Sequence, residues 1–125
     1  MPTTLIRILV PGTSKRFRCG GLSVELQTAR LLSSLCATEL VTYRERHQDH
    51  PFLDDVLTVE PSRPEVLWIV SWGFDVPALV RRLRSHRVAY HAHSSGYGFT
   101  LPPGVPVLAV SRNTLGLSLI HISEP

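Results

Sequence analysis

Leu5-Ile-Arg-Ile-Leu-Val-Pro-Gly12 joins a short apolar run to a loop, a junction typical of a buried parallel strand. A glycine pair, Gly20-Gly21, follows, and apolar residues then recur at helical spacing. They predict a helix that begins near Gly21 or Leu22. The residues in this helical pattern are Leu22, Leu26, Ala29, Leu32 and Leu35. A strand, a loop and a helix in this order begin an alternating α/β chain.

The same alternation continues downstream. Strands are predicted at 38–43, 66–71, 87–93 and 105–110, and a short one at 55–59. A helix is predicted at 76–84, with Asp75 as its cap and Pro77 in its first turn. Another helix is expected to start at Ser111. The sequence therefore predicts an α/β fold, a Rossmann-like parallel sheet with helices on both faces.

Composition limits the function classes only loosely. The chain has 125 residues, 43% hydrophobic and 18% charged, which fits one folded domain. Its formal net charge of +3 is weak support for a polyanionic partner. The basic segment 81–87 is expected to be a solvated helix surface, and no nucleic-acid-binding motif accompanies it, so nucleic acid is not an expected partner. No apolar run is long enough to span a bilayer and no secretory signal opens the chain, so the cytoplasm is the expected compartment.

In an open parallel sheet, ligands bind beyond the carboxyl ends of the strands. The first loop there ends at Gly20 and Gly21, whose backbone N–H groups suit a phosphate or a sugar hydroxyl. Lys15, Arg16 and Arg18 add positive charge. The spacing matches neither the dinucleotide fingerprint nor a Walker A loop. The alternative is that the glycine pair only shapes a strand-to-helix turn.

Two histidines, His91 and His93, lie on one side of the same predicted strand because side chains alternate with period two. A metal site would need a third ligand that the spacing does not supply, so no metal is expected. We expect His91 to be a satisfied histidine within the sheet and His93 to contact substrate at the strand end. Further on, Ser111 either caps a helix or, with Arg112, faces the crevice.

Together these segments resemble the N-terminal, acceptor-side half of a GT-B glycosyltransferase of the family-4-like group, and more narrowly a cyanobacterial type of it. The resemblance is carried by Ile8-Leu-Val-Pro-Gly12, by Arg18-Cys-Gly-Gly-Leu-Ser-Val-Glu-Leu26, by the strand ending in His93, and by Pro106-Val-Leu-Ala-Val-Ser-Arg-Asn-Thr114. It implies that residues 1–116 form an incomplete Rossmann-like domain.

In that family the N-terminal domain mainly holds the acceptor, and a C-terminal domain mainly holds the nucleotide-sugar donor. The resemblance implies that Gly20 and Gly21 approach the donor's phosphates or sugar. It also implies that His93 acts in catalysis by contacting the transferred sugar, and that Ser111 and Arg112 line the cleft. The donor-domain motifs have no counterpart, so the chain is expected to be inactive alone. No cofactor is expected, and a lipid acceptor would bring peripheral membrane association.

The last segment, Leu117-Ser-Leu-Ile-His-Ile-Ser-Glu-Pro125, breaks the α/β pattern. It resembles the conceptual translation of a transposase-type sequencing adapter, which implies that residues 117–125 are a non-native tail without functional weight. The alternative is a genuine apolar strand or helix end. For the chain as a whole, the alternative to a glycosyltransferase is a non-catalytic Rossmann-like module that binds a nucleotide or a protein.

Overall fold

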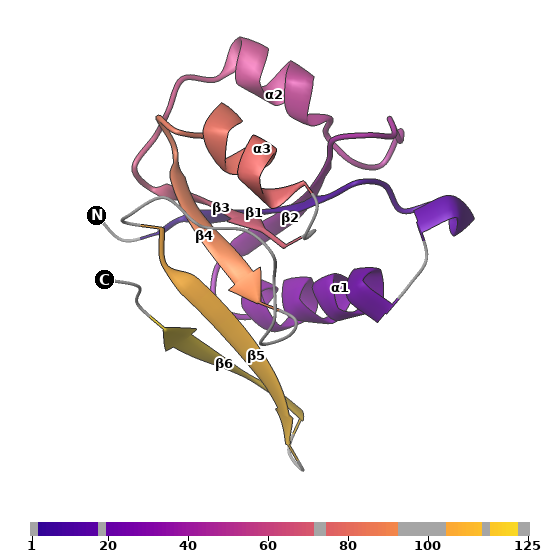
Figure 1. Cartoon of the computed structure of the whole chain (residues 1–125), viewed down its shortest axis with the longest axis vertical. Helices are drawn as coiled ribbons and strands as arrows, with labels where there is room; N and C mark the ends of the chain where they lie inside the picture. The colour runs from indigo at the N-terminus through magenta and orange to yellow at the C-terminus, as the bar shows by residue number, and fades with distance from the viewer. Residues whose placement is uncertain (1–2, 18–19, 72–74, 93–104, 114–115, 123–125) are drawn as a thin grey trace.

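A computed structural model describes residues 3–17, 20–71, 75–92, 105–113 and 116–122, with side chains at 3–17, 22–71, 75–91 and 105–107. Its centre is one six-stranded sheet of order β2-β1-β3-β4-β5-β6 (Figure 1). The strands are β1 (Leu5–Val10), β2 (Ala37–Thr42), β3 (Val66–Val70), β4 (Arg87–Ala92), β5 (Val107–Asn113) and β6 (Gly116–Ile122). β1 to β5 run parallel and β6 pairs antiparallel with β5.

Helices cover both faces of this sheet. The long helix α1 (Gly20–Ser33) lies on one face, and α2 (Leu53–Val59) and α3 (Val76–Arg82) lie on the other (Figure 1). A short 3-10 helix, η1 (Lys15–Phe17), precedes α1. The predicted α/β Rossmann-like architecture is thereby confirmed. β2 lies on one side of β1 and β3 on the other, so the direction in which strands are added to the sheet reverses between β1 and β3.

Each face has its own apolar cluster because side chains alternate along the strands. Ile6, Ile8 and Val10 of β1 pack with Leu22 of α1, whereas Leu9 packs with the cluster beneath α2 and α3. The predicted helical pattern of α1 is wrong at two positions. Leu26 is exposed, and Leu35 is exposed beyond the end of the helix.

A buried arginine, Arg7, extends from β1 toward the α2–α3 face and is only 6% exposed. Its Nε donates to Glu39 Oε1 over 2.7 Å, and its Nη1 and Nη2 donate to the two carboxylate oxygens of Glu60 over 2.8 and 3.0 Å. The guanidinium also lies 5.1 Å from the ring centroid of Trp68, which is buried as expected. Strand register sets Glu39 of β2 and Trp68 of β3 directly opposite Arg7 of β1. Through its bonds to Glu60, the guanidinium also connects these three strands to the end of α2.

The short strand predicted at 55–59 is wrong, because these residues form most of α2. Asp54 and Asp55 lie in its first turn, where acidic side chains favour the positive end of the helix dipole. Leu53 and Val56, three residues apart, supply its buried face. Tertiary packing of that face outweighs the β-favouring composition of the segment.

The helix predicted from Ser111 is also wrong. β5 continues through Ser111 and Arg112 to Asn113, and β6 pairs along it, with Ser111 opposite Ser118. A strand that finds a hydrogen-bonding neighbour can continue where a helix start is expected. Residues 116–122 thus form β6, and the derivation of residues 117–125 from an adapter stays a prediction.

In the part of the chain that the structure describes, no helix is both long enough and apolar enough to cross a bilayer. The arginines around the end of α3, Arg81, Arg82 and Arg84, are exposed, as expected for a solvated basic surface.

Candidate functional site

The loops that follow β1 and β2 are tied to each other at the carboxyl edge of the sheet. The carboxylate of Glu45 accepts hydrogen bonds from the backbone N–H and the hydroxyl of Ser14, over 3.3 and 2.8 Å. The carbonyl of Pro11 accepts from the backbone N–H groups of Arg44 and Glu45, each over 3.0 Å. These bonds fix the path that the chain takes from β1 toward α1.

Gly12 is required by close packing within this loop. A Cβ atom at this position would lie 2.5 Å from the ring of Phe17 and 2.9 Å from the Cβ of Glu45. Contacts this short force the neighbours to move, so the Pro11-Gly12 turn and η1 fit together only without a side chain here.

α1 begins at Gly20, one or two residues before the start that was predicted near Gly21 or Leu22. The first backbone N–H groups of a helix have no partner within the helix and carry its positive dipole. Lys15 lies exposed in η1, in the loop that leads to this helix start, whereas Arg18 lies outside the described residues. Lys15, Gly20 and Gly21 therefore all lie on the chain segment that leads from β1 into α1.

Two buried hydroxyls lie at the carboxyl ends of the two strands that flank β1. They belong to Thr42 at the end of β2 and to Ser71 just after β3. Their residues are 0% and 6% exposed, and neither hydroxyl has a hydrogen-bond partner among the described residues. Leu40 of β2 and Ile69 of β3 belong to the apolar cluster on the face of the sheet that α1 covers. Thr42 and Ser71 each follow one of these residues by two positions, so both lie on the same face. A buried hydroxyl without a partner costs free energy unless water or a ligand satisfies it.

α1 also makes a buried polar contact with β4. Nδ1 of His91 and Oε1 of Glu25 are 2.5 Å apart, and the residues are 1% and 0% exposed. The prediction that His91 is a satisfied histidine inside the sheet is confirmed. The other predicted histidine, His93, lies outside the described residues.

The predicted cap of α3 is wrong. Asp75 occupies the N-cap position, but its side chain makes no cap hydrogen bond. Its Oδ2 instead accepts from the Tyr43 hydroxyl over 2.6 Å, and its Oδ1 pairs with Arg44. Burial and this bond to Asp75 raise the pKa of Tyr43 well above its ordinary value. Tyr43 therefore stays protonated and joins the end of β2 to the start of α3.

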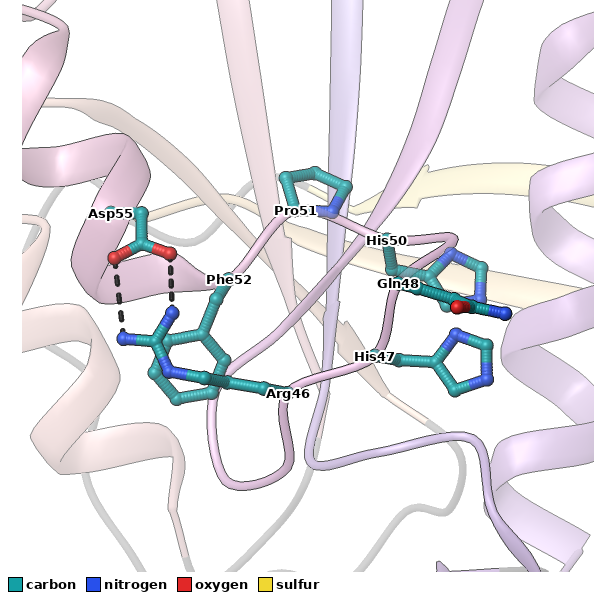
Figure 2. Close-up of a pocket in the computed structure, with 7 residues that line it drawn as sticks. All are labelled: Arg46, His47, Gln48, His50, Pro51, Phe52 and Asp55. Atoms are coloured by element: carbon teal, nitrogen blue, oxygen red, sulfur yellow. Dashed lines mark hydrogen bonds and ion pairs between the residues drawn. The ribbon is translucent and has the colours of Figure 1, made fainter.

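The connection from β2 to α2, together with Asp55 of α2, lines a pocket of about 350 Å³. We call it the 46–55 pocket after its lining residues: Arg46, His47, Gln48, His50, Pro51, Phe52 and Asp55. Figure 2 shows Arg46, Phe52 and Asp55 together on one side of it and His47, Gln48 and His50 on the other. The sequence gives no signal for this pocket, because the spacing of its histidines matches no known ligand motif.

The remaining predicted residues are not gathered at this site. Ser111 and Arg112 lie on β5, which is separated from β1 and β2 by β3 and β4. Within the described ranges, no group of three or more histidine, cysteine, aspartate or glutamate side chains is arranged to hold a metal ion.

Removing the Glu45 carboxylate should loosen the loop before α1. In Glu45→Ala, the loss of the two bonds to Ser14 is expected to raise amide hydrogen exchange across residues 12–17 at least about tenfold, because each bond contributes about 1 kcal/mol or more. Exchange in β3 should change little. The matched control is Gln48→Ala in the same connection, which leaves Ser14 untouched. Equal exchange in both variants would show that Glu45 does not hold the loop.

No protein-family model, curated protein or solved structure matches this chain.

Proposed function

We propose that this chain is the acceptor-side domain of a GT-B-type glycosyltransferase, which transfers a sugar from a nucleotide-sugar donor to an acceptor and needs a second, donor-binding domain for the transfer. The observation that carries the proposal is the start of α1 at Gly20, on the face of the sheet where the hydroxyls of Thr42 and Ser71 are buried without described partners.

The chemistry of this edge suits a diphosphate-linked sugar. Backbone N–H groups and the positive end of a helix stabilise phosphate oxygens, and Lys15, in the segment before α1, would add a cation. In glycosyl transfer the bond to the leaving diphosphate breaks while positive charge develops on the sugar. Hydrogen-bond donors of the protein that already point toward the diphosphate stabilise that transition state without a metal ion.

The resemblance seen in the sequence supports further roles within this proposal. His93 follows β4 in the chain and would contact the transferred sugar. Ser111 and Arg112 lie on β5 and would line the cleft. Most of the stabilisation of the leaving group would come from the donor domain, so the chain alone is proposed to bind donor weakly and to transfer nothing.

The test is a titration of the chain with UDP-glucose, GDP-mannose, pyrophosphate and uridine, followed through backbone amide chemical shifts. Both nucleotide-sugars and pyrophosphate should shift residues 14–17 and 20–24, and uridine should not. Lys15→Ala should weaken binding about threefold to tenfold through the loss of one charged contact. Arg30→Ala removes the same charge near the other end of α1 and should have no effect.

Two results would contradict the proposal. If uridine binds as well as the nucleotide-sugars, the base rather than the sugar diphosphate is recognised, and the nucleotide-binding module becomes the better description. If Arg30→Ala weakens binding as much as Lys15→Ala, the attraction is a general effect of net charge and not a site at the start of α1.

A further inference from the structure

Two histidines lie close together in the tight turn that follows β2. His47 and His50 are the first and last residues of this turn, which the backbone N–H of His50 closes by donating to the His47 carbonyl over 3.2 Å. The two ends of such a turn lie less than about 7 Å apart. Directly after the turn, the Pro51 carbonyl accepts the backbone N–H of Thr42 over 3.0 Å. The backbone therefore holds the two imidazoles near each other before any ligand binds.

The distance between the two rings fits one shared metal ion. Their centroids are 5.2 Å apart, and their planes are tilted by 37°. An imidazole nitrogen lies about 2.0–2.1 Å from a zinc ion, so two rings that bind one ion in tetrahedral geometry have centroids about 5 Å apart. Figure 2 shows both rings on the same side of the 46–55 pocket. The His47 side chain is 36% exposed and His50 is half-buried, so an ion reaches both from solvent.

Asp49 lies against one nitrogen of His47. Its backbone N–H donates to Nδ1 over 3.1 Å, and its Oδ2 lies 3.8 Å from the same nitrogen. Nε2 is therefore the nitrogen that is left for a metal ion. When Nε2 binds the ion, the proton of the neutral imidazole moves to Nδ1, where a small rotation brings the Asp49 carboxylate within reach to accept it. A carboxylate at the second nitrogen commonly orients a metal-binding histidine.

We infer that His47 and His50 form a two-histidine site for a divalent transition-metal ion of the zinc, nickel and copper class. Neutral imidazoles suit these ions, whereas Mg²⁺ and Ca²⁺ prefer oxygen ligands. Water fills the remaining coordination positions, which is why the histidine spacing matches no motif with three or four protein ligands. On the other side of the pocket Asp55 balances the charge of Arg46. The site does not depend on the proposed glycosyl transfer.

The test is a titration of the chain with zinc chloride, followed by calorimetry and by backbone amide chemical shifts at mildly alkaline pH, where few protons compete for the imidazoles. Zinc should shift residues 46–51, and magnesium chloride should not. His47→Ala and His50→Ala should each weaken zinc binding about tenfold or more, because the remaining imidazole loses a second ligand that is held nearby. The matched control is His86→Ala. His86 is also half-buried and lies just before β4, at the opposite edge of the sheet, so its loss should leave the affinity unchanged.

Every other outcome overturns the site. If zinc leaves residues 46–51 unshifted at millimolar concentration, the turn does not bind it. If either His47→Ala or His50→Ala keeps the wild-type affinity, one histidine binds the ion alone and the two do not share it. If His86→Ala weakens binding as much as the two turn variants, zinc binds surface histidines without preference. If magnesium binds as well as zinc, carboxylates rather than imidazoles are the ligands.

Discussion

Glu25→Ala is expected to lower the free energy of unfolding by about 3–5 kcal/mol, the range found when one partner of a buried ionisable pair is removed. Glu25 is fully buried in α1, and its Oε1 lies 2.5 Å from Nδ1 of His91. Alanine leaves that imidazole without this partner and also leaves space between α1 and β4. Urea denaturation followed by circular dichroism measures the change.

Glu25→Gln separates the contribution of charge from that of shape. The amide can still accept a hydrogen bond from the imidazole, so the expected loss is smaller, about 1–2 kcal/mol. Ser23→Ala, on the exposed side of the same helix, should change stability by less than about 0.5 kcal/mol. A loss below about 1 kcal/mol in Glu25→Ala would mean that the pair does not hold α1 to the sheet.

Arg7→Ala is expected to have the next largest effect, a loss of about 2–3 kcal/mol. Breaking a buried pair commonly costs more, but Glu39 and Glu60 are each about one-third exposed, so water can solvate the carboxylates that remain. The substitution also removes the contact with the face of Trp68. Denaturant unfolding at neutral pH measures the loss.

Arg63→Ala is the matched control, because Arg63 also pairs with Glu60, over 3.4 Å, from an exposed position. The stability lost in Arg63→Ala should stay below about 0.5 kcal/mol, as is usual for surface ion pairs. Equal losses in the two variants would show that the burial of Arg7 adds nothing to its ion pairs.

The Arg7 network should also depend on pH. The hydrogen bond from Arg7 holds the pKa of Glu60 below its ordinary value of 4.5. A carboxyl group with a lowered folded-state pKa adds stability above its unfolded-state pKa, and this stability is lost as the pH falls through the folded-state pKa. The difference in stability between the wild-type chain and Arg7→Ala should therefore shrink as the pH falls below about 4.5. A difference that is constant with pH would contradict this linkage.

The sheet could be predicted from sequence because its strands are short apolar runs between turn residues, as at Leu5–Val10 and Val66–Val70. The start of α1 was predicted to within one or two residues from Gly20-Gly21 and the leucines after it. His91 was correctly expected to be structural, since a histidine inside a buried strand needs an internal partner. These features depend on local pattern.

The features that were missed depend on contacts between distant segments. Val56 to Val59 have β-favouring side chains, yet they lie in a helix because Leu53 and Val56 pack onto the sheet. Asp75 has the position of a cap, but Tyr43 and Arg44 bind its carboxylate. The partner of His91, Glu25, was not identified, because an acidic residue within a helical pattern is usually solvent-exposed. The 46–55 pocket likewise depends on how Arg46 folds back over Phe52.

The position of β2 has a consequence for association between chains. β2 is one of the two edge strands of the sheet, and an exposed edge can add a strand from another molecule. The chain protects its carboxyl end itself, since the Pro51 carbonyl accepts the backbone N–H of Thr42 over 3.0 Å. In the middle of β2, the carboxylate of Glu39 places a negative charge at this edge of the sheet while it binds Arg7. The carboxylate that helps to hold the fold thus also discourages intermolecular strand pairing and aggregation.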